Sequence, residues 1–142
     1  MYNVKIVETE KEHADAFAVR KKVFVEEQGV PLHLECDALD ATATHFIMYE
    51  GYEPVGAARL RSIEDHTAKI ERVCILQSQR GKKLGVLIMQ EMEKFAISIQ
   101  QKKLKLHAQS YAVPFYEKLG YTVTSPEFMD AGIPHRAMEK EI

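Results

Sequence analysis

The chain has 142 residues, the length of one domain with a core of its own. A charged fraction of 28% and a net charge of -2 give no general attraction to nucleic acid or to an anionic membrane. No window is long and apolar enough to span a bilayer, and the first residues lack the apolar centre of a signal peptide. Two cysteines and six histidines without ligand spacing predict a reduced, cytoplasmic protein with no metal site.

The first third of the chain predicts a strand, a helix and an acidic connection. The strand covers residues 2–8, where apolar and polar side chains alternate. Thr9 and Glu12 then have the spacing of a capping box, which begins a helix that runs to about residue 27. Residues 32–42 form an acidic connection. It is either a solvated loop or part of the wall around an acceptor substrate.

The rest of the chain predicts mostly strands, with one long helix and one short helix. The strand pattern covers residues 45–50, 55–62, 69–76, 104–109, 121–124 and 134–140, and the helical pattern covers residues 83–100 and 110–119. The long helix joins two strands in a crossover, so those two strands should be parallel. We therefore expect an α+β fold with a mixed, mostly antiparallel sheet flanked by helices, in the order β-α-β-β-β-α-β-α-β-β.

A basic loop with two glycines stands before the long helix. The first turn of a helix has N–H groups without partners and a partial positive charge, and Gly81 and Gly85 would let a phosphate approach the backbone. The sequence matches neither a Walker A loop nor a dinucleotide fingerprint. Arg80, Lys82 and Lys83 could also form a solvated turn or touch nucleic acid, although no interleaved aromatic residue supports nucleic-acid binding.

Two motifs resemble those of the GNAT N-acetyltransferases. The loop from Arg80 to Gly85 is similar to the family's acetyl-CoA loop, Q/R-x-x-G-x-G/A, with Lys83 in place of the first motif glycine. The segment from Gln109 to Tyr121 is similar to the pattern N-x-x-A-x-x-x-Y-E-K-L-G-F. Near the N-terminus, the segment around Phe24 resembles the small bacterial ElaA/YjcF-like branch. The resemblance covers nearly the whole chain and implies a single N-acetyltransferase domain over residues 1–142.

The resemblance implies how acetyl-CoA would be held. In this family two parallel strands splay apart, and the pantetheine arm lies along the first strand, as in other forms of strand addition. The loop amides would hold the pyrophosphate, and the phenol at position 116 would protonate the departing thiolate. The coenzyme-binding residues implied are Val73, Cys74, Ile75, Arg80, Gly81, Lys82, Lys83, Leu84, Gly85 and Gln109. If Lys83 needs a positive φ, it carries a strain of roughly 1 kcal/mol or more.

Transfer to an amine also needs a base, because an alkylammonium with a pKa of about 10.4 is almost fully protonated at neutral pH. Glu71 is the leading candidate, since an acid among apolar strand residues is costly unless it is used. Its alternative role is an ion pair, and Glu26, Glu27 and Asp37 are the other candidate bases. Tyr116 could instead be a core aromatic residue. Cys74 could be a nucleophile, but it has no histidine partner visible in the sequence.

The most consistent hypothesis is direct transfer from acetyl-CoA to a primary amine within a ternary complex. One alternative is a non-catalytic acetyl-CoA sensor of the same fold. Another is an acyl-homoserine-lactone synthase, which shares the Arg-x-x-Val-Phe opening but lacks the motif around Tyr116. The acceptor would be a small-molecule or peptide amine, cationic if the acids at residues 26–40 face the cleft. We expect no nucleic acid or membrane partner, and a monomer or homodimer.

Overall fold

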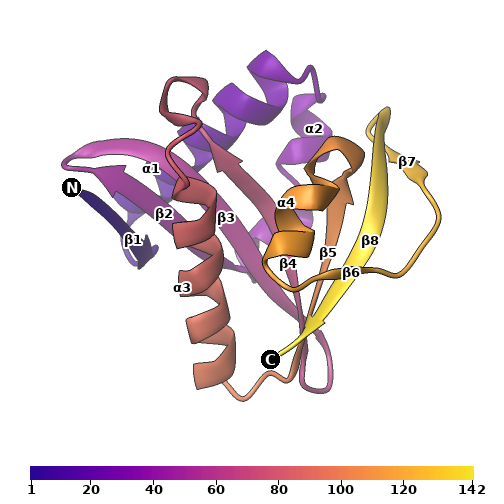
Figure 1. Cartoon of the computed structure of the whole chain (residues 1–142). Helices are drawn as coiled ribbons and strands as arrows, with labels where there is room; N and C mark the ends of the chain where they lie inside the picture. The colour runs from indigo at the N-terminus through magenta and orange to yellow at the C-terminus, as the bar shows by residue number, and fades with distance from the viewer.

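A computed structural model describes all residues, 1–142. One eight-stranded sheet runs through it in the order β1-β2-β3-β4-β5-β8-β6, with β7 paired to β8. Helices α3 and α4 cover one face of this sheet, and α1 and α2 lie on the other (Figure 1). The strands are β1 (Tyr2–Ile6), β2 (Thr44–Glu50), β3 (Glu53–Glu64), β4 (Thr67–Ile75), β5 (Lys103–Gln109), β6 (Thr122–Val123), β7 (Phe128–Asp130) and β8 (Ile133–Glu141).

The helical segments are α1 (Glu10–Arg20), the π-helix η1 (Lys21–Glu27), α2 (Leu32–Glu35), η2 (Ala38–Ala41), η3 (Gln77–Gln79), α3 (Leu84–Ser98), η4 (Ser110–Ala112) and α4 (Val113–Lys118). The sheet is antiparallel throughout except for the β4–β5 pair, which is parallel. The predicted fold class, an α+β fold with a mixed, mostly antiparallel sheet, is therefore confirmed.

The first helix shows both a success and a failure of the sequence prediction. The capping box is present, because the N–H of Glu12 donates to Oγ1 of Thr9 (3.1 Å) and the N–H of Thr9 donates to Oε1 of Glu12 (3.1 Å). The helix does not stay α-helical to residue 27, however, because η1 continues it with the wider turn of a π-helix. Segments of π-helix are rare and are frequent at functional sites.

Strand β7 was missed because its turn carries no clear sequence signal. Ala131 and Gly132 join β7 to β8, and both have a positive φ (52° and 77°). Two-residue turns of this kind usually contain Asn-Gly or Asp-Gly, whereas alanine rarely adopts a positive φ. The acidic connection of residues 32–42 was also more ordered than predicted, since it contains α2 and η2.

Two buried clusters lie on opposite faces of the sheet. The larger contains Leu84, Ile88 and Met92 of α3 packed on the apolar face of β2–β5. The smaller joins Ala16 and Val19 of α1 to the other face of the sheet. Helices thus pack on both faces of β3 and β4, and this packing fixes the position of these two strands in the sheet.

The sheet opens between β4 and β5. These strands pair only over four positions, from Thr67 with Lys103 to Ile70 with Leu106. Beyond Ile70 the strands separate, although β5 stays paired with β8 as far as Gln109. A bulge on β4 lies where the gap begins, and Arg72 in this bulge has a φ of 59°. The last five residues of β4 thus present one main-chain edge that no neighbouring strand covers.

Candidate active site

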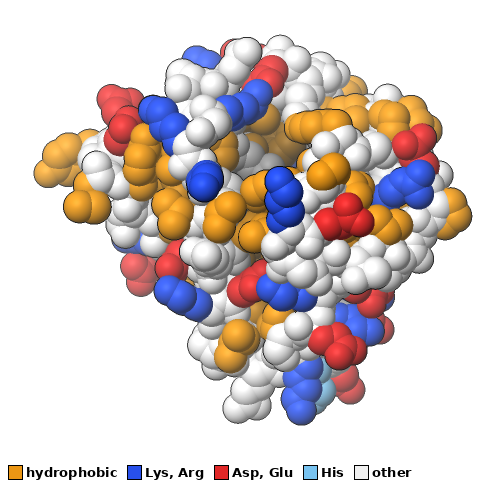
Figure 2. Space-filling view, in the orientation of Figure 1, with side chains coloured by type: hydrophobic (Ala, Val, Ile, Leu, Met, Phe, Trp, Pro, Cys, Tyr) orange, Lys and Arg blue, Asp and Glu red, His pale blue; other side chains and the backbone are white.

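A cavity of about 800 Å³ occupies the gap in the sheet. Its walls come from three sources: the π-helix and α2 on one side, β3 and β4 below, and β5, β8 and α4 on the other side. The space-filling view shows a hollow with hydrophobic side chains along its rim (Figure 2). The cavity therefore reaches from the N-terminal end of α3 through the sheet to the face covered by α1 and α2.

The loop before α3 has the geometry of an anion site. Its N-cap residue, Lys83, provides no side-chain cap, and the first turn of α3 contains no acidic residue. The unpaired amides of that turn are therefore left for a ligand or for water. The N–H of Arg80, also expected to face the diphosphate, donates to the carbonyl of Gln77 (3.3 Å). The amides suited to a diphosphate are those from Gly81 to Gly85.

Two of the three cationic side chains of the loop, those of Arg80 and Lys82, form hydrogen bonds within the protein. Nη2 of Arg80 donates to Oε1 of Glu27 (2.8 Å), and its Nε donates to the carbonyl of Ile75 (3.1 Å). Nζ of Lys82 donates to Oε1 of Gln79 (3.1 Å). Arg80 thus ties the loop to the π-helix, and this hydrogen bond lowers the pKa of Glu27. Glu27 is therefore a poor candidate for the base.

Gly85 is explained by packing and not by access to a ligand. A Cβ at this position would lie 3.0 Å from Cζ of Phe115 on α4. Gly81 has a φ of +84° and free space around it, so its requirement is conformational. The missing side chain of Gly85 thus lets α4 pack closely on α3, which is a requirement for glycine that the sequence did not reveal.

Lys83 has a φ of 60° and a ψ of 27°, which is the left-handed region. A side chain is strained there, whereas glycine is not, although glycine loses more backbone entropy on folding. We expect Lys83→Gly to raise the free energy of unfolding by roughly 0.5–1 kcal/mol. Urea unfolding measures this. Gln100→Gly is the matched control, since Gln100 has a φ of 65° at the other end of α3, and it should give a similar gain. If neither variant is more stable than wild type, the left-handed conformation of Lys83 carries no strain.

Val73, Cys74 and Ile75, which the resemblance implies bind the coenzyme, form the uncovered end of β4 and line the cavity. Cys74 is buried, and burial raises the pKa of its thiol to about 12. A thiol with that pKa is almost entirely protonated at neutral pH and is a weak nucleophile. The main chain of this segment, and not its thiol, is therefore the part suited to an extended ligand.

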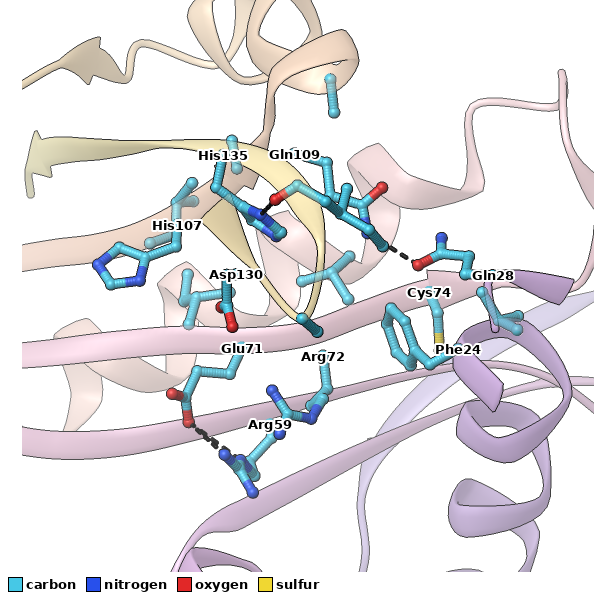
Figure 3. A pocket seen from close by; sticks show the side chains of 18 of the residues that line it. Phe24, Gln28, Arg59, Glu71, Arg72, Cys74, His107, Gln109, Asp130 and His135 are labelled. Carbon is cyan, nitrogen blue, oxygen red and sulfur yellow. Dashed lines mark hydrogen bonds and ion pairs between the residues drawn. The ribbon is translucent and has the colours of Figure 1, made fainter. Parts of the chain in front are cut away.

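Gln109 lies across the cavity from β4. Its Nε2 donates to Oε1 of Gln28 (2.9 Å), at the end of the π-helix, so one hydrogen bond spans the space between β5 and η1 (Figure 3). Gln28 was not among the predicted site residues. Its contact with Gln109 could not be read from a separation of 81 residues in the sequence.

Tyr116 is half-buried on α4 and lines the cavity next to Phe115, whose ring meets it edge to face at 4.9 Å. Burial raises the pKa of its phenol above its usual value. Its hydroxyl makes no hydrogen bond within the protein, in contrast to the hydroxyl of Tyr121, which donates to Glu93. Tyr116 therefore keeps its proton at neutral pH and has a free O–H in the cavity.

Glu71 is held by three cations. Its carboxylate lies 2.8 Å from Nη2 of Arg59, 2.8 Å from Nε of Arg61 and 3.4 Å from Nζ of Lys69. Burial alone would raise its pKa. The hydrogen bond from Arg61 and the charges of Arg59 and Lys69 outweigh that effect and lower it to about 2. This is the ion-pair alternative, and it makes Glu71 a poor proton acceptor (Figure 3).

The acids of the connection after the π-helix are also paired with arginines. Asp37 lies 2.7 Å from Nη1 of Arg59, which lowers its pKa, and Glu35 lies 2.7 Å from Nε of Arg20. Glu26 is exposed and does not line the cavity. The acids Glu35, Asp37 and Asp40 of this connection are thus paired with arginines, so their charge gives no support to a cationic acceptor.

Comparison with known proteins identifies the family to which this fold and cavity belong. The family model described as "Acetyltransferase (GNAT) domain" matches residues 8–142. The chain belongs to the GNAT acetyltransferases. It is 46% identical over 137 residues to the uncharacterized N-acetyltransferase YjcF of Bacillus subtilis, which covers 96% of this chain and 97% of the relative. The predicted family and its YjcF-like branch are thus confirmed.

Two solved structures share the fold. Escherichia coli ElaA has a TM-score of 0.89 at 23% identity, over 99% of this chain and all (100%) of that one. An acyl-CoA N-acyltransferase of Pseudomonas aeruginosa has a TM-score of 0.87 at 24% identity, over 99% and 98% of the two chains. In this GNAT chain no helix is long and apolar enough to cross a membrane, and no group of three His, Cys, Asp or Glu side chains could hold a metal ion.

Proposed function

We propose that this GNAT protein transfers an acetyl group from acetyl-CoA to a primary amine by direct attack within a ternary complex. The observation that carries the proposal is the gap between β4 and β5, because the cavity in it extends from the uncapped N-terminal end of α3 to the π-helix and α2 on the other face of the sheet. A long coenzyme and a separate acceptor could enter such a cavity from opposite sides. We propose that residues 1–142 act as one domain.

The coenzyme fits this cavity through main-chain groups. The amides from Gly81 to Gly85 would bind the diphosphate, because anions are stabilised at a helix N-terminus. Val73, Cys74 and Ile75 would pair with the pantetheine amides, since their edge faces no other strand. The thioester would then lie near Tyr116 and the start of the gap.

The reaction needs one proton at sulfur. The electron pair of a neutral amine forms the new C–N bond, the C–S bond breaks, and the thiolate takes a proton. Tyr116 is suited to give that proton, because its buried phenol stays protonated and its O–H has no partner in the protein.

The proposal is tested by two measurements on the wild-type protein. Calorimetric titration with acetyl-CoA should show binding, and CoA release should depend on an added amine from a panel of polyamines, aminoglycosides, amino acids and peptide N-termini. Binding without any amine-dependent release would instead favour a non-catalytic acetyl-CoA sensor. This sensor is the second candidate, because each predicted base is either paired with an arginine or exposed outside the cavity. No binding would contradict both.

Direct transfer also makes a prediction about Cys74. Since its thiol has a pKa of about 12, we expect Cys74→Ala to keep kcat within about threefold of wild type. Steady-state CoA release measures this. An acetylated Cys74 detected by intact mass after rapid quenching, together with loss of turnover in Cys74→Ala, would contradict direct transfer.

We place the reaction in the cytoplasm. Cys36 and Cys74 are both free thiols, which fits a reducing compartment.

A further inference from the structure

We propose that His135 is the base that takes a proton from the acceptor amine; this rests on the proposed function. His135 was not among the predicted site residues. It lies on β8, is 9% exposed and lines the cavity. The predicted bases are paired with arginine or lie outside the cavity, which leaves His107, Asp130 and His135 as the proton acceptors that line it.

The ring of His135 is fixed in one tautomer. Its Nδ1 lies 2.7 Å from the carbonyl oxygen of Ile133. A carbonyl can only accept, so Nδ1 must donate and carries the proton. The neutral ring then has its lone pair on Nε2, which makes no hydrogen bond within the protein. The ring also stacks on Phe128, with centroids 6.1 Å apart and an angle of 22° between the planes. Nε2 is thus a positioned proton acceptor.

Nε2 of His135 lies at the gap between β4 and β5. His135 pairs with Gln109 across β5 and β8, at the end of β5 that has separated from β4. The close-up shows His135 and Gln109 on one side of the cavity and Glu71 and Arg72 of β4 on the other (Figure 3). An amine that approaches a thioester lying along β4 would therefore pass beside the imidazole.

The main rival is His107, two residues before Gln109 on β5. It also lines the cavity and packs edge to face on Phe128 at 5.0 Å. It is exposed, and no hydrogen bond fixes its tautomer. Asp130 lines the cavity too, but it is exposed on the strand before the turn into β8. His135 alone among these three combines burial with an oriented ring.

Two protons leave the acceptor nitrogen in the proposed reaction. An ammonium loses two protons when it becomes an amide. The first passes to Nε2 of His135, which gives the neutral amine and an imidazolium that releases the proton to solvent. The second leaves nitrogen as the C–N bond forms and the C–S bond breaks. By way of water it restores the phenol of Tyr116, which has protonated sulfur.

The first test reads the tautomer and needs no turnover. Protein labelled with ¹⁵N in histidine is compared with His135→Asn to assign the ring signals. We expect the neutral ring to carry its proton on Nδ1 and to have an unprotonated Nε2. A proton on Nε2 of the neutral ring would overturn the proposal. If wild-type protein binds acetyl-CoA but acetylates no amine, the proposed function fails, and this measurement still decides whether Nε2 can accept a proton.

The second test separates a base from a structural histidine. Asparagine keeps an N–H donor near the place of Nδ1, so His135→Asn should retain the bond to Ile133 and the melting temperature, while it has no base. The acceptors are benzylamine, which is protonated at neutral pH, and aniline, which has a similar shape and is neutral. We expect kcat/KM to fall by about 10²- to 10⁴-fold with benzylamine and by no more than about tenfold with aniline.

Two results would overturn the assignment. Equal losses with both amines would mean that His135 only shapes the cavity. A loss selective for benzylamine in His107→Asn, with none in His135→Asn, would make His107 the base.

Discussion

Tyr116→Phe should lower kcat by about 10²- to 10³-fold and leave the Kd for acetyl-CoA unchanged. The substitution removes the O–H that we propose protonates the departing thiolate, and it keeps the aromatic ring that packs against Phe115. Since the hydroxyl makes no hydrogen bond in the protein, its loss leaves no partner unsatisfied. Steady-state CoA release gives kcat, and calorimetry with acetyl-CoA gives the Kd.

Tyr121→Phe is the matched control for this result. The hydroxyl of Tyr121 donates to Glu93 (3.1 Å), and the residue is buried outside the cavity lining. We expect this variant to lose about 1–3 kcal/mol of stability and to keep its kcat. Unchanged turnover in Tyr116→Phe would remove Tyr116 from the mechanism. A loss of turnover of the same size in Tyr121→Phe would show that kcat responds to packing in general.

Arg59→Met should cost about 3–5 kcal/mol of stability. Arg59 is 1% exposed and lies within 2.8 Å of Asp37, Asp40 and Glu71. Without it, these carboxylates stay in a partly buried site with too little positive charge. Arg61→Met is the control: its only acidic partner is Glu71, which keeps two other cations, so we expect a loss nearer 1 kcal/mol. Urea unfolding at neutral pH measures both, and equal losses would contradict the central role of Arg59.

The same network predicts how stability changes with pH. Glu71 and Asp40 have pKa values of about 2, since hydrogen bonds and charges from arginines outweigh burial, which alone would raise them. Both values lie below those of an unfolded chain, near 4. Their contribution is therefore fully present above about pH 4.5 and is lost as the pH falls towards 2. Arg59→Met should flatten this dependence between pH 5 and pH 3, and a slope equal to that of wild type would count against the network.

The sequence was sufficient for the parts of the site that are continuous in the chain. The loop from Arg80 to Gly85 and the motif around Tyr116 each combine a local pattern with an element boundary, so their strand, turn and helix could be predicted. The parallel pairing of β4 with β5 followed from the helix between them, and the fold class followed from the order of elements.

The parts assembled from distant segments could not be predicted. Glu71 looked like an isolated acid in an apolar strand, but Arg59 lies opposite it on β3, Arg61 lies opposite Lys69, and Lys69 shares its face on β4. The alternation of Arg59, Arg61, Lys69 and Glu71 was a usable signal for one charged face, because side chains two apart on a strand point the same way. His135 gave no such signal, since its tautomer depends on a carbonyl whose position is set by the β7–β8 turn.

The uncovered edge of β4 has a consequence for solubility. A free strand edge at a protein surface can recruit strands from other chains, and proteins usually protect such edges with charge, proline or a bulge. Here the uncovered edge begins with the charged residues Glu71 and Arg72 and a bulge, whereas Val73, Cys74 and Ile75 carry no charge and line the cavity. These three residues are thus protected from pairing with a strand of another chain by their place inside the cavity and not by charge.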